Sequence, residues 1–112
     1  MTSKWKIEFY RDADDQKPVE KYIKEKDDKT ISLLLLLVQR LENLGPEIQG
    51  TNMDKLIEGP IRELRKDRHR ILYGRHGNTF VLLTAFLKET QKTPPEQIEL
   101  AKKRFVEHLS KR

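Results

Sequence analysis

The stretch that decides the fold runs from Ile61 to Arg75 and reads IRELRKDRHRILYGR. It mixes apolar and charged residues in the manner of β-strands. Its charges are unbalanced, because the two acids Glu63 and Asp67 are outnumbered by five arginines: Arg62, Arg65, Arg68, Arg70 and Arg75. A solvated sheet face would mix the two signs, so the stretch predicts a hairpin with a basic face.

A two-residue turn at 66–67 would join strands over 61–66 and 68–75. The cross-strand pairs would then be Arg65 with Arg68, Glu63 with Arg70, and Ile61 with Leu72. These residues share one face, which is predicted to be a charged platform. The other face carries a more apolar set that is expected to lie beneath helices: Arg62, Leu64, His69, Ile71 and Tyr73.

A third strand is predicted over 79–88, and the length of the loop before it decides which side chains join the platform. A three-residue loop at 76–78 adds Leu82, Thr84, Phe86 and Lys88, whereas a two-residue turn at 77–78 adds Leu83, Ala85 and Leu87. We prefer the first register. Phe86 and Lys88 would then supply the stacking ring and the cation that single-stranded nucleic acids require.

Three further segments surround this sheet. Period-two alternation and aromatic content predict a first strand over 5–10. A proline at the first turn and an apolar i, i+3, i+4 face predict a helix over 18–26. Residues 46–60 contain two Pro and two Gly and are predicted to form a loop with a short turn around 53–57.

The second helix is predicted to begin at the caps Asp27 and Asp28 and to end at Gly45, which Pro46 follows. Consecutive leucines at positions 33–37 cover nearly its whole circumference, so a single sheet cannot bury them all. Packing against both the first helix and the sheet is the favoured explanation. A partner-binding surface is the alternative.

A capping box, with Thr93 at N-cap and Glu96 at N3, predicts a last helix that extends to about Leu109. The order is therefore β-α-α-β-β-β-α, which indicates an α+β domain over residues 1–112. We expect a small twisted, mainly antiparallel sheet with the two N-terminal helices on one face, and a C-terminal helix.

The amino-acid composition narrows the range of possible functions. Residues 1–60 carry 10 Lys and Arg against 12 Asp and Glu, whereas residues 61–112 carry 13 against 6, so the second half is basic. An anionic partner, nucleic acid first, or a merely solvated surface would explain this asymmetry. The chain has no Cys for a disulfide, a thiolate nucleophile or a zinc-thiolate site. No signal peptide or membrane-spanning run is evident, so a cytoplasmic location is expected.

The run IRELRKDRHRILYGRHGNTFVLLTAFLKETQKTPPEQIELAKKR, about 45 residues, resembles the C-terminal half of the HigB-type, phage-derived branch of the RelE/ParE toxin superfamily. The pieces that carry the resemblance are Glu63-Leu64-Arg65, Arg70-Ile71-Leu72-Tyr73, and Phe86-Leu87-Lys88 leading through Gln91-Lys92-Thr93-Pro94 into Glu99-Leu100-Ala101. The resemblance implies a RelE-like fold. It also implies a toxin that cleaves mRNA in the ribosomal A site and is neutralised by a helix-turn-helix antitoxin, with a toxin–antitoxin heterotetramer on operator DNA as one form of the complex.

RNA cleavage without a metal uses the 2′-OH as nucleophile, so the enzyme must move protons and stabilise a charged phosphorane. Arg65 and Arg70 suit the phosphorane, and the resemblance places catalytic cations at Arg70 and Lys88. The complete expected set comprises catalytic Arg65, Arg70, Lys88, Glu63 and Lys92, and nucleic-acid-binding Arg62, Arg68, Phe86 and Arg104. The histidines have no metal-ligand spacing, so neither a metal nor a cofactor is expected.

The sequence leaves more than one role open for some of these residues. Glu63 could act as base or could orient Arg70, and the orienting role is favoured. Lys92 could act as acid if neighbouring cations lowered its pKa, although a solvated loop lysine is the more frequent case. His69 is expected on the core face, so the platform lacks an evident acid–base histidine. This lack fits a need for the ribosome to align the substrate.

Two other functions fit the same residues. One is a ParE-like inhibitor of DNA gyrase, and the other is a nucleic-acid-binding module without catalysis. For the toxin, we expect the antitoxin to draw much of its affinity from surplus leucines of the second helix, namely Leu33, Leu36 and Leu37, because apolar burial contributes more than exposed ion pairs.

Overall fold

The computed structural model describes residues 4–111 and confirms the α+β class. The elements are β1 (Lys6–Phe9), α1 (Pro18–Lys24), α2 (Asp28–Leu44), a 3₁₀ helix η1 (Gly45–Gly50), β2 (Asp54–Glu58), β3 (Ile61–Lys66), β4 (His69–His76), β5 (Thr79–Leu87) and α3 (Pro95–Ser110). Within the described residues, no helix is both long enough and apolar enough to cross a membrane.

The sheet has the strand order β1-β5-β4-β3-β2 and is mainly antiparallel, as predicted, with β1 alone parallel to its neighbour β5. The prediction of a loop over 46–60 was wrong, because this segment contains η1 and the edge strand β2. Most of β2 is exposed and polar, so it lacks the alternation that marks a half-buried strand. It forms a strand because its backbone pairs with that of β3.

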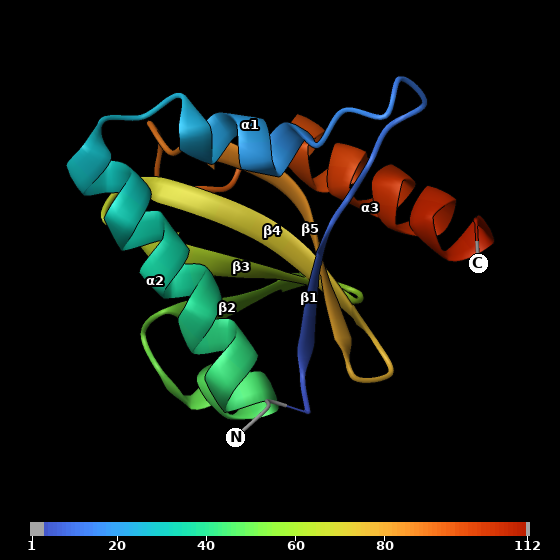
Figure 1. The fold of residues 1–112 in the computed structure, drawn as a ribbon, viewed down its shortest axis with the longest axis horizontal. Coiled ribbons are helices and arrows are strands. Elements are labelled where there is room, and N and C mark those ends of the chain that lie inside the picture. Colours follow the sequence, from blue (N-terminus) through green and yellow to red (C-terminus); the bar gives the residue numbers. More distant parts are fainter. Residues whose placement is uncertain (1–3, 112) are drawn as a thin grey trace.

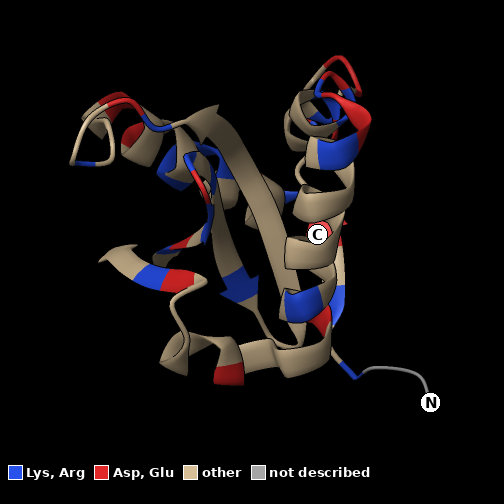
Figure 2. Ribbon diagram, turned by 90° about the vertical axis from the view of Figure 1, so that its left-hand side faces the viewer, with Lys and Arg blue, Asp and Glu red and all other residues tan. Residues whose placement is uncertain are grey.

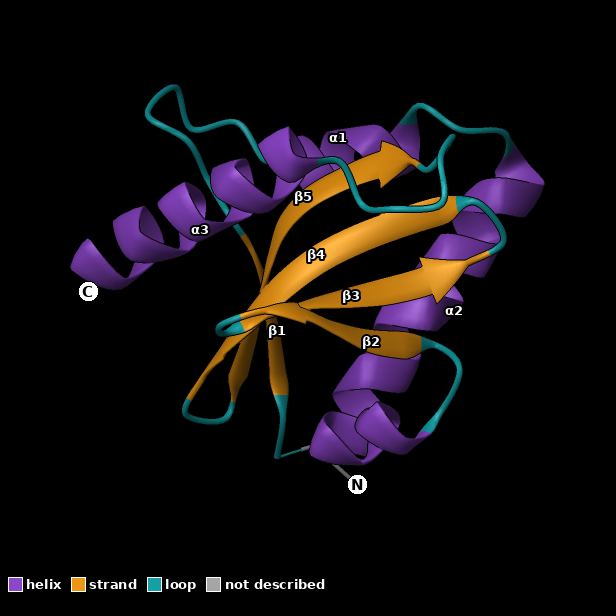
Figure 3. Ribbon diagram, turned by 180° about the vertical axis from the view of Figure 1, so that it is seen from behind, coloured by secondary structure: helices purple, strands orange, loops and turns teal. Residues whose placement is uncertain are grey.

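The helices cover opposite faces of the sheet. Helices α1 and α2 lie in front of the sheet in Figure 1 and bury a core with the side chains of Leu64, Ile71 and Leu82. Helix α3 lies behind and packs Phe105 into a second core on the other face. We call this second surface the α3 face. Seen from behind, α3 lies nearer to β5 than to β2 and β3 (Figure 3).

The β3–β4 hairpin confirms the predicted faces with a different register. Its turn is Asp67-Arg68, with Asp67 in a left-handed conformation at φ 53°, rather than 66–67. Arg65 therefore pairs with Arg70, and Glu63 pairs with Leu72. The observed register differs from the predicted one by an even number of residues. Each side chain of the two strands therefore keeps the face that the alternation assigned to it.

The β4–β5 hairpin has a two-residue turn at 77–78, so the three-residue loop was a wrong prediction. A bulge at Leu83 then shifts the register, and Leu72 pairs with Thr84. Beyond the bulge Thr84 and Phe86 lie on the α3 face as predicted, whereas Leu82 lies on the opposite face.

The predicted helix ends were partly correct. Asp27 caps α2 by accepting a hydrogen bond from the Thr30 backbone N–H at 3.0 Å. Gly45 follows α2 at φ 57°, where an added Cβ would lie 2.4 Å from the Trp5 ring. Helix α1 ends at Lys24, two residues earlier than predicted. The capping box before α3 is wrong, because Pro94 holds the N-cap position and the Thr93 side chain is engaged elsewhere.

The leucines of α2 divide between core and surface. Leu34 and Leu37 are buried against the sheet, so Leu37 does not belong to a partner-binding surface. Leu35 and Leu36 remain 50% and 45% exposed. Helix α2 therefore does carry leucines that the fold leaves exposed, as expected, but they are mainly Leu35 and Leu36.

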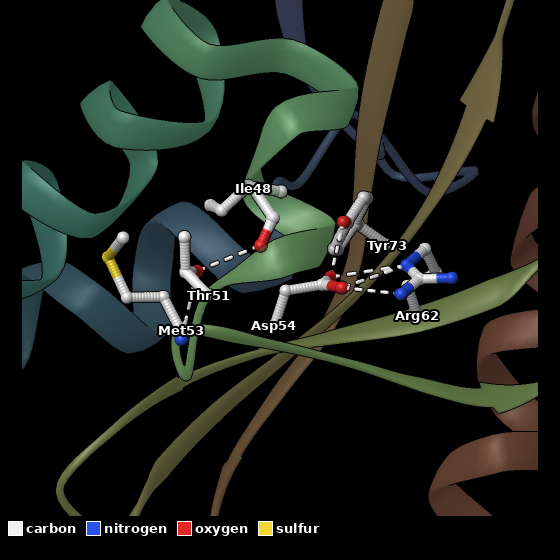
Figure 4. Close-up of polar contacts among 6 residues, drawn as sticks. All are labelled: Ile48, Thr51, Met53, Asp54, Arg62 and Tyr73. Carbon is white, nitrogen blue, oxygen red and sulfur yellow. Dashed lines mark hydrogen bonds and ion pairs between the residues drawn. The ribbon is translucent and has the colours of Figure 1, made fainter.

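A buried polar cluster fastens the edge strand β2 to the sheet (Figure 4). The Asp54 carboxylate is fully buried and accepts hydrogen bonds from the Tyr73 hydroxyl at 2.6 Å and from the Arg62 Nη2 at 2.6 Å. Burial raises the pKa of the Tyr73 hydroxyl, and the Asp54 bond raises it further. One carboxylate thus joins strands β2, β3 and β4.

We expect Asp54→Asn to lower the free energy of unfolding by about 2 kcal/mol, because the amide puts an NH₂ donor in place of one accepting oxygen and leaves Arg62 without its counter-charge. Urea unfolding followed by circular dichroism measures the loss. The matched control is Asp14→Asn in an exposed turn, which should change stability by less than about 0.5 kcal/mol. Equal losses in the two variants would contradict a role for this cluster.

Candidate active site

Most charged residues are exposed or half-buried, and many of them lie at turns and on the helices (Figure 2). Glu63 and Arg70 are exceptions, because both are buried in the sheet with exposures of 0% and 8%. Burying charged side chains is costly unless they are paired. Their presence on the α3 face marks this end of β3 and β4 as the candidate site.

Glu63 lies at the centre of the site. Its Oε2 accepts a hydrogen bond from the Thr93 hydroxyl at 2.6 Å. Its Oε1 faces two guanidinium groups, with Arg70 Nε at 3.5 Å and Arg65 Nε at 3.9 Å. The predicted pairing of Glu63 with Arg70 therefore exists, although it is a diagonal contact. Arg65 and Arg70 stand directly opposite each other, and the carboxylate offsets the repulsion between them.

Arg70 is held in a fixed orientation. Its Nη1 donates hydrogen bonds to the backbone oxygens of Asp67 at 2.7 Å and of His69 at 2.9 Å. Burial lowers the pKa of the guanidinium, while Glu63 raises it and Arg65 lowers it. An arginine remains charged at physiological pH under these influences. Both Arg70 Nε and Glu63 Oε1 are buried without a hydrogen bond, so this contact is loose.

Lys88 follows β5 and completes the group of cations. Its backbone N–H donates to the Arg68 carbonyl at 2.7 Å, and Arg68 Nε donates back to the Lys88 carbonyl at 3.2 Å. Burial lowers the pKa of the Lys88 amine, and Glu63 opposes this effect. Nearby cations lower the pKa further: Arg70, Lys55 and Arg65.

An open cavity of about 360 Å³ adjoins these groups. Its lining comprises Asn52, Met53, Arg65, Lys66, Asp67 and Arg70. Because Arg70 Nη1 is hydrogen-bonded to the backbone and Nε is buried facing Glu63, Nη2 is the guanidinium nitrogen left to bind an anion here. The cations on its wall therefore make this cavity suited to binding a phosphate group.

The structure brings Glu63, Arg65, Arg70 and Lys88 together, as the sequence predicted. Arg68 is exposed at the turn beside them. Lys92 lies in the exposed loop that joins β5 to α3, and this loop crosses the end of β4 (Figure 3).

Three residues predicted to bind nucleic acid lie elsewhere. Arg62 is on the opposite face of the sheet and pairs with Asp54. Phe86 is 9% exposed and packs in the core beneath α3, so its ring is not a stacking surface. Arg104 donates to the Leu83 carbonyl at 2.8 Å and lies over the Tyr10 ring, so it supports the bulge.

Two residues of the site were not predicted from the sequence. Thr93 was assigned to a helix cap, and no pattern indicated that its hydroxyl would contact Glu63. Lys55 lies on β2 directly opposite Glu63, and it was missed because that strand was not predicted. An approach of Lys55 to β3 could have been found only by recognising the β2–β3 hairpin.

His69 lies on the helix side, as expected. A hydrogen bond of 2.7 Å joins its Nδ1 and the Tyr22 hydroxyl. Burial lowers the pKa of His69, and the Lys26 cation lowers it further. A neutral packing histidine on the face opposite Arg70 is not placed to serve as the base of this site.

Comparisons relate this chain to a protein family and to individual known proteins. The model of the family described as "Phage derived protein Gp49-like" matches residues 21–106. Two curated proteins named "Probable endoribonuclease HigB1", from Mycobacterium tuberculosis strains CDC 1551 / Oshkosh and H37Rv, are each 37% identical over 102 residues, which cover 87% of this chain and 78% of theirs. A solution structure of the Helicobacter pylori protein HP0894 has a TM-score of 0.43 at 22% identity, over 76% of this chain and 93% of that one.

Proposed function

The chain belongs to the Gp49-like family of phage-derived proteins, within the HigB-like branch of the RelE/ParE toxins, and we propose from this premise that it is an mRNA-cleaving endoribonuclease toxin. The observation that carries the proposal is the buried pair Glu63 and Arg70, with Arg65 and Lys88 beside it, where Arg65 and Arg70 also line an open cavity. The curated relatives are named as endoribonucleases.

In the proposed reaction the RNA 2′-OH gives its proton to water and attacks the adjacent phosphate, which forms a 2′,3′-cyclic phosphate as the bond to the 5′-oxygen of the next nucleotide breaks. Arg70 and Arg65 bind the phosphate and stabilise the additional negative charge of the phosphorane. Lys88 adds a third cation, and the lowered pKa of its amine suits a proton donor to the leaving oxygen. Lys92 remains a candidate acid on the adjoining loop.

Glu63 has a positioning role in this proposal. Its carboxylate is fully buried and is occupied by Thr93 and the two arginines, so it is poorly placed to take a proton from a bound 2′-OH. Among the described residues, no histidine lies on the α3 face beside Arg70 to supply a base. Alignment of the message by the ribosome would then contribute much of the rate, and the protein would act in the cytoplasm by inhibiting translation.

The proposed partner is a helix-turn-helix antitoxin, since the family consists of antitoxin-paired toxins. A groove of about 720 Å³ on the helix side suits it, with α2 and β1 as its walls. Its apolar lining consists of Ile7, Phe9, Leu35, Leu36 and Val38. Ile7 and Phe9 pack on the helix-side core, so an antitoxin segment seated here would leave Arg70 uncovered. It would neutralise by blocking entry to the ribosome, and pairs of such complexes could occupy operator DNA.

Primer extension on several messages after induction tests the activity. We expect new 5′ ends within translated reading frames and none when translation is blocked beforehand. Growth arrest with intact transcripts would reject the endoribonuclease. Loss of supercoiling by purified gyrase would instead indicate the ParE-like function, and salt-dependent RNA binding without scission would indicate the non-catalytic module.

A further inference from the structure

Strand β2 adds a lysine to the face that carries the candidate active site. Lys55 pairs with Glu63 in the antiparallel β2–β3 ladder, and residues directly opposite each other project from the same face of a sheet. The neighbouring residue Asp54 is buried on the helix side beside Tyr73, which confirms the alternation along β2. Lys55 is exposed on the α3 face.

The charge of Lys55 is free for a ligand. Among residues 4–111, no Asp or Glu side chain forms an ion pair with it. Lys102, a lysine of α3, differs in this respect because Glu58 and Glu99 both contact its amine. Lys55 also lies close enough to Lys88 for its charge to lower the pKa of that amine.

Mutual repulsion among these cations is unfavourable in the unliganded protein. Lys55, Arg65, Arg70 and Lys88 gather around a single carboxylate, that of Glu63. A bound polyanion would relieve the repulsion. Neighbouring strands are about 4.8 Å apart, so β2 and β4 are separated by roughly 10 Å, a distance that suits separate phosphates of one strand.

We propose that Lys55 binds a backbone phosphate of the RNA next to the phosphate held by Arg70, so that the message crosses the sheet from β4 toward the β2 edge. This inference rests on the proposed function and adds to it the direction in which the RNA crosses the sheet. Lys55 supplies affinity and register, while the cations at Arg65, Arg70 and Lys88 act on the reacting phosphate.

The test uses three variants of the full chain: Lys55→Gln, which removes the charge, Lys55→Arg, which keeps it, and Lys29→Gln, which removes an exposed charge on α2 as the matched control. The probe is a single-stranded RNA oligonucleotide that is 2′-O-methylated throughout, because it binds without being cleaved. Affinity is measured as a function of salt concentration. Unfolding midpoints equal to that of the wild type establish that each variant is folded.

We expect Lys55→Gln to reduce the slope of log affinity against log salt by about 0.7, the value for one phosphate contact on a single strand. Lys55→Arg and Lys29→Gln should keep the wild-type slope. In a translating extract, Lys55→Gln should raise KM about 5- to 10-fold, with kcat within twofold. This separation indicates binding of substrate rather than an effect on the chemical step.

A wild-type slope for Lys55→Gln, or an equal loss in Lys29→Gln, would overturn the assignment. Loss of affinity in Lys55→Arg as large as in Lys55→Gln would also overturn it, because a phosphate contact tolerates either cation. The binding readout does not depend on cleavage. If the wild type binds the probe but cuts no message, the proposed function fails while the assignment of Lys55 is still decided by the slopes.

Discussion

Replacing Arg70 with alanine should reduce RNA cleavage by a factor on the order of 10²–10³ and should also destabilise the protein. The loss of activity follows because the guanidinium is the group best fixed to stabilise the phosphorane. The loss of stability, about 3 kcal/mol, follows because Glu63 would keep its buried charge without its closest counter-ion. Rates in a translating extract and urea unfolding measure the two effects.

A second variant separates chemistry from folding. Adding Glu63→Gln to Arg70→Ala removes the unpaired charge, and the amide oxygen can still accept the hydrogen bond from Thr93. We expect this double variant to recover most of the lost stability without recovering cleavage. A double variant that cleaves at nearly the wild-type rate would show that Arg70 acts only through the fold.

Replacing Leu35 and Leu36 together with serine should weaken antitoxin binding about 50- to 100-fold while leaving RNA cleavage intact. Both side chains are about half exposed, and both line the groove between α2 and β1. Burying their exposed parts in a complex would contribute roughly 2–3 kcal/mol. Calorimetric titration of the antitoxin into each purified toxin variant measures the difference.

The control for this prediction is a second exposed apolar pair, Val106 and Leu109 of α3, with exposures of 64% and 38%. Their double replacement by serine removes apolar surface from a different helix and should leave antitoxin affinity unchanged. An affinity loss in the α3 pair and none in the α2 pair would move the antitoxin to the opposite face. Leu37 is unsuitable for either test, because it is 3% exposed and belongs to the core.

The fold was predictable where local signals were strong. Apolar periodicity placed α1, α2 and α3, and alternation placed β1, β3, β4 and β5. Strand β2 could not be predicted, because its backbone pairing with β3 and its buried Asp54 are tertiary features without a local pattern. The register between β4 and β5 was predicted wrongly for a similar reason, since nothing in the sequence marks the bulge at Leu83.

The site was predictable to the extent that it follows from alternation along one hairpin. Glu63, Arg65 and Arg70 share a face whichever even-numbered register the hairpin takes. Phe86 was predicted on the correct face but with the wrong environment, because the position of α3 above it could not be read from β5. Thr93 and Lys55 reach the site from distant segments, which a local pattern cannot reveal.

The hydrogen bond from Thr93 to Glu63 also concerns the synthesis of the protein. Arg65 and Arg70 emerge from the ribosome before Lys88 and Thr93, which follow them in the sequence. Until that last segment emerges and folds back over β4, the arginines lack their third cation and the central carboxylate lacks its hydroxyl partner. The site is therefore incomplete until residues 88–93 have been synthesised and have folded against β3 and β4.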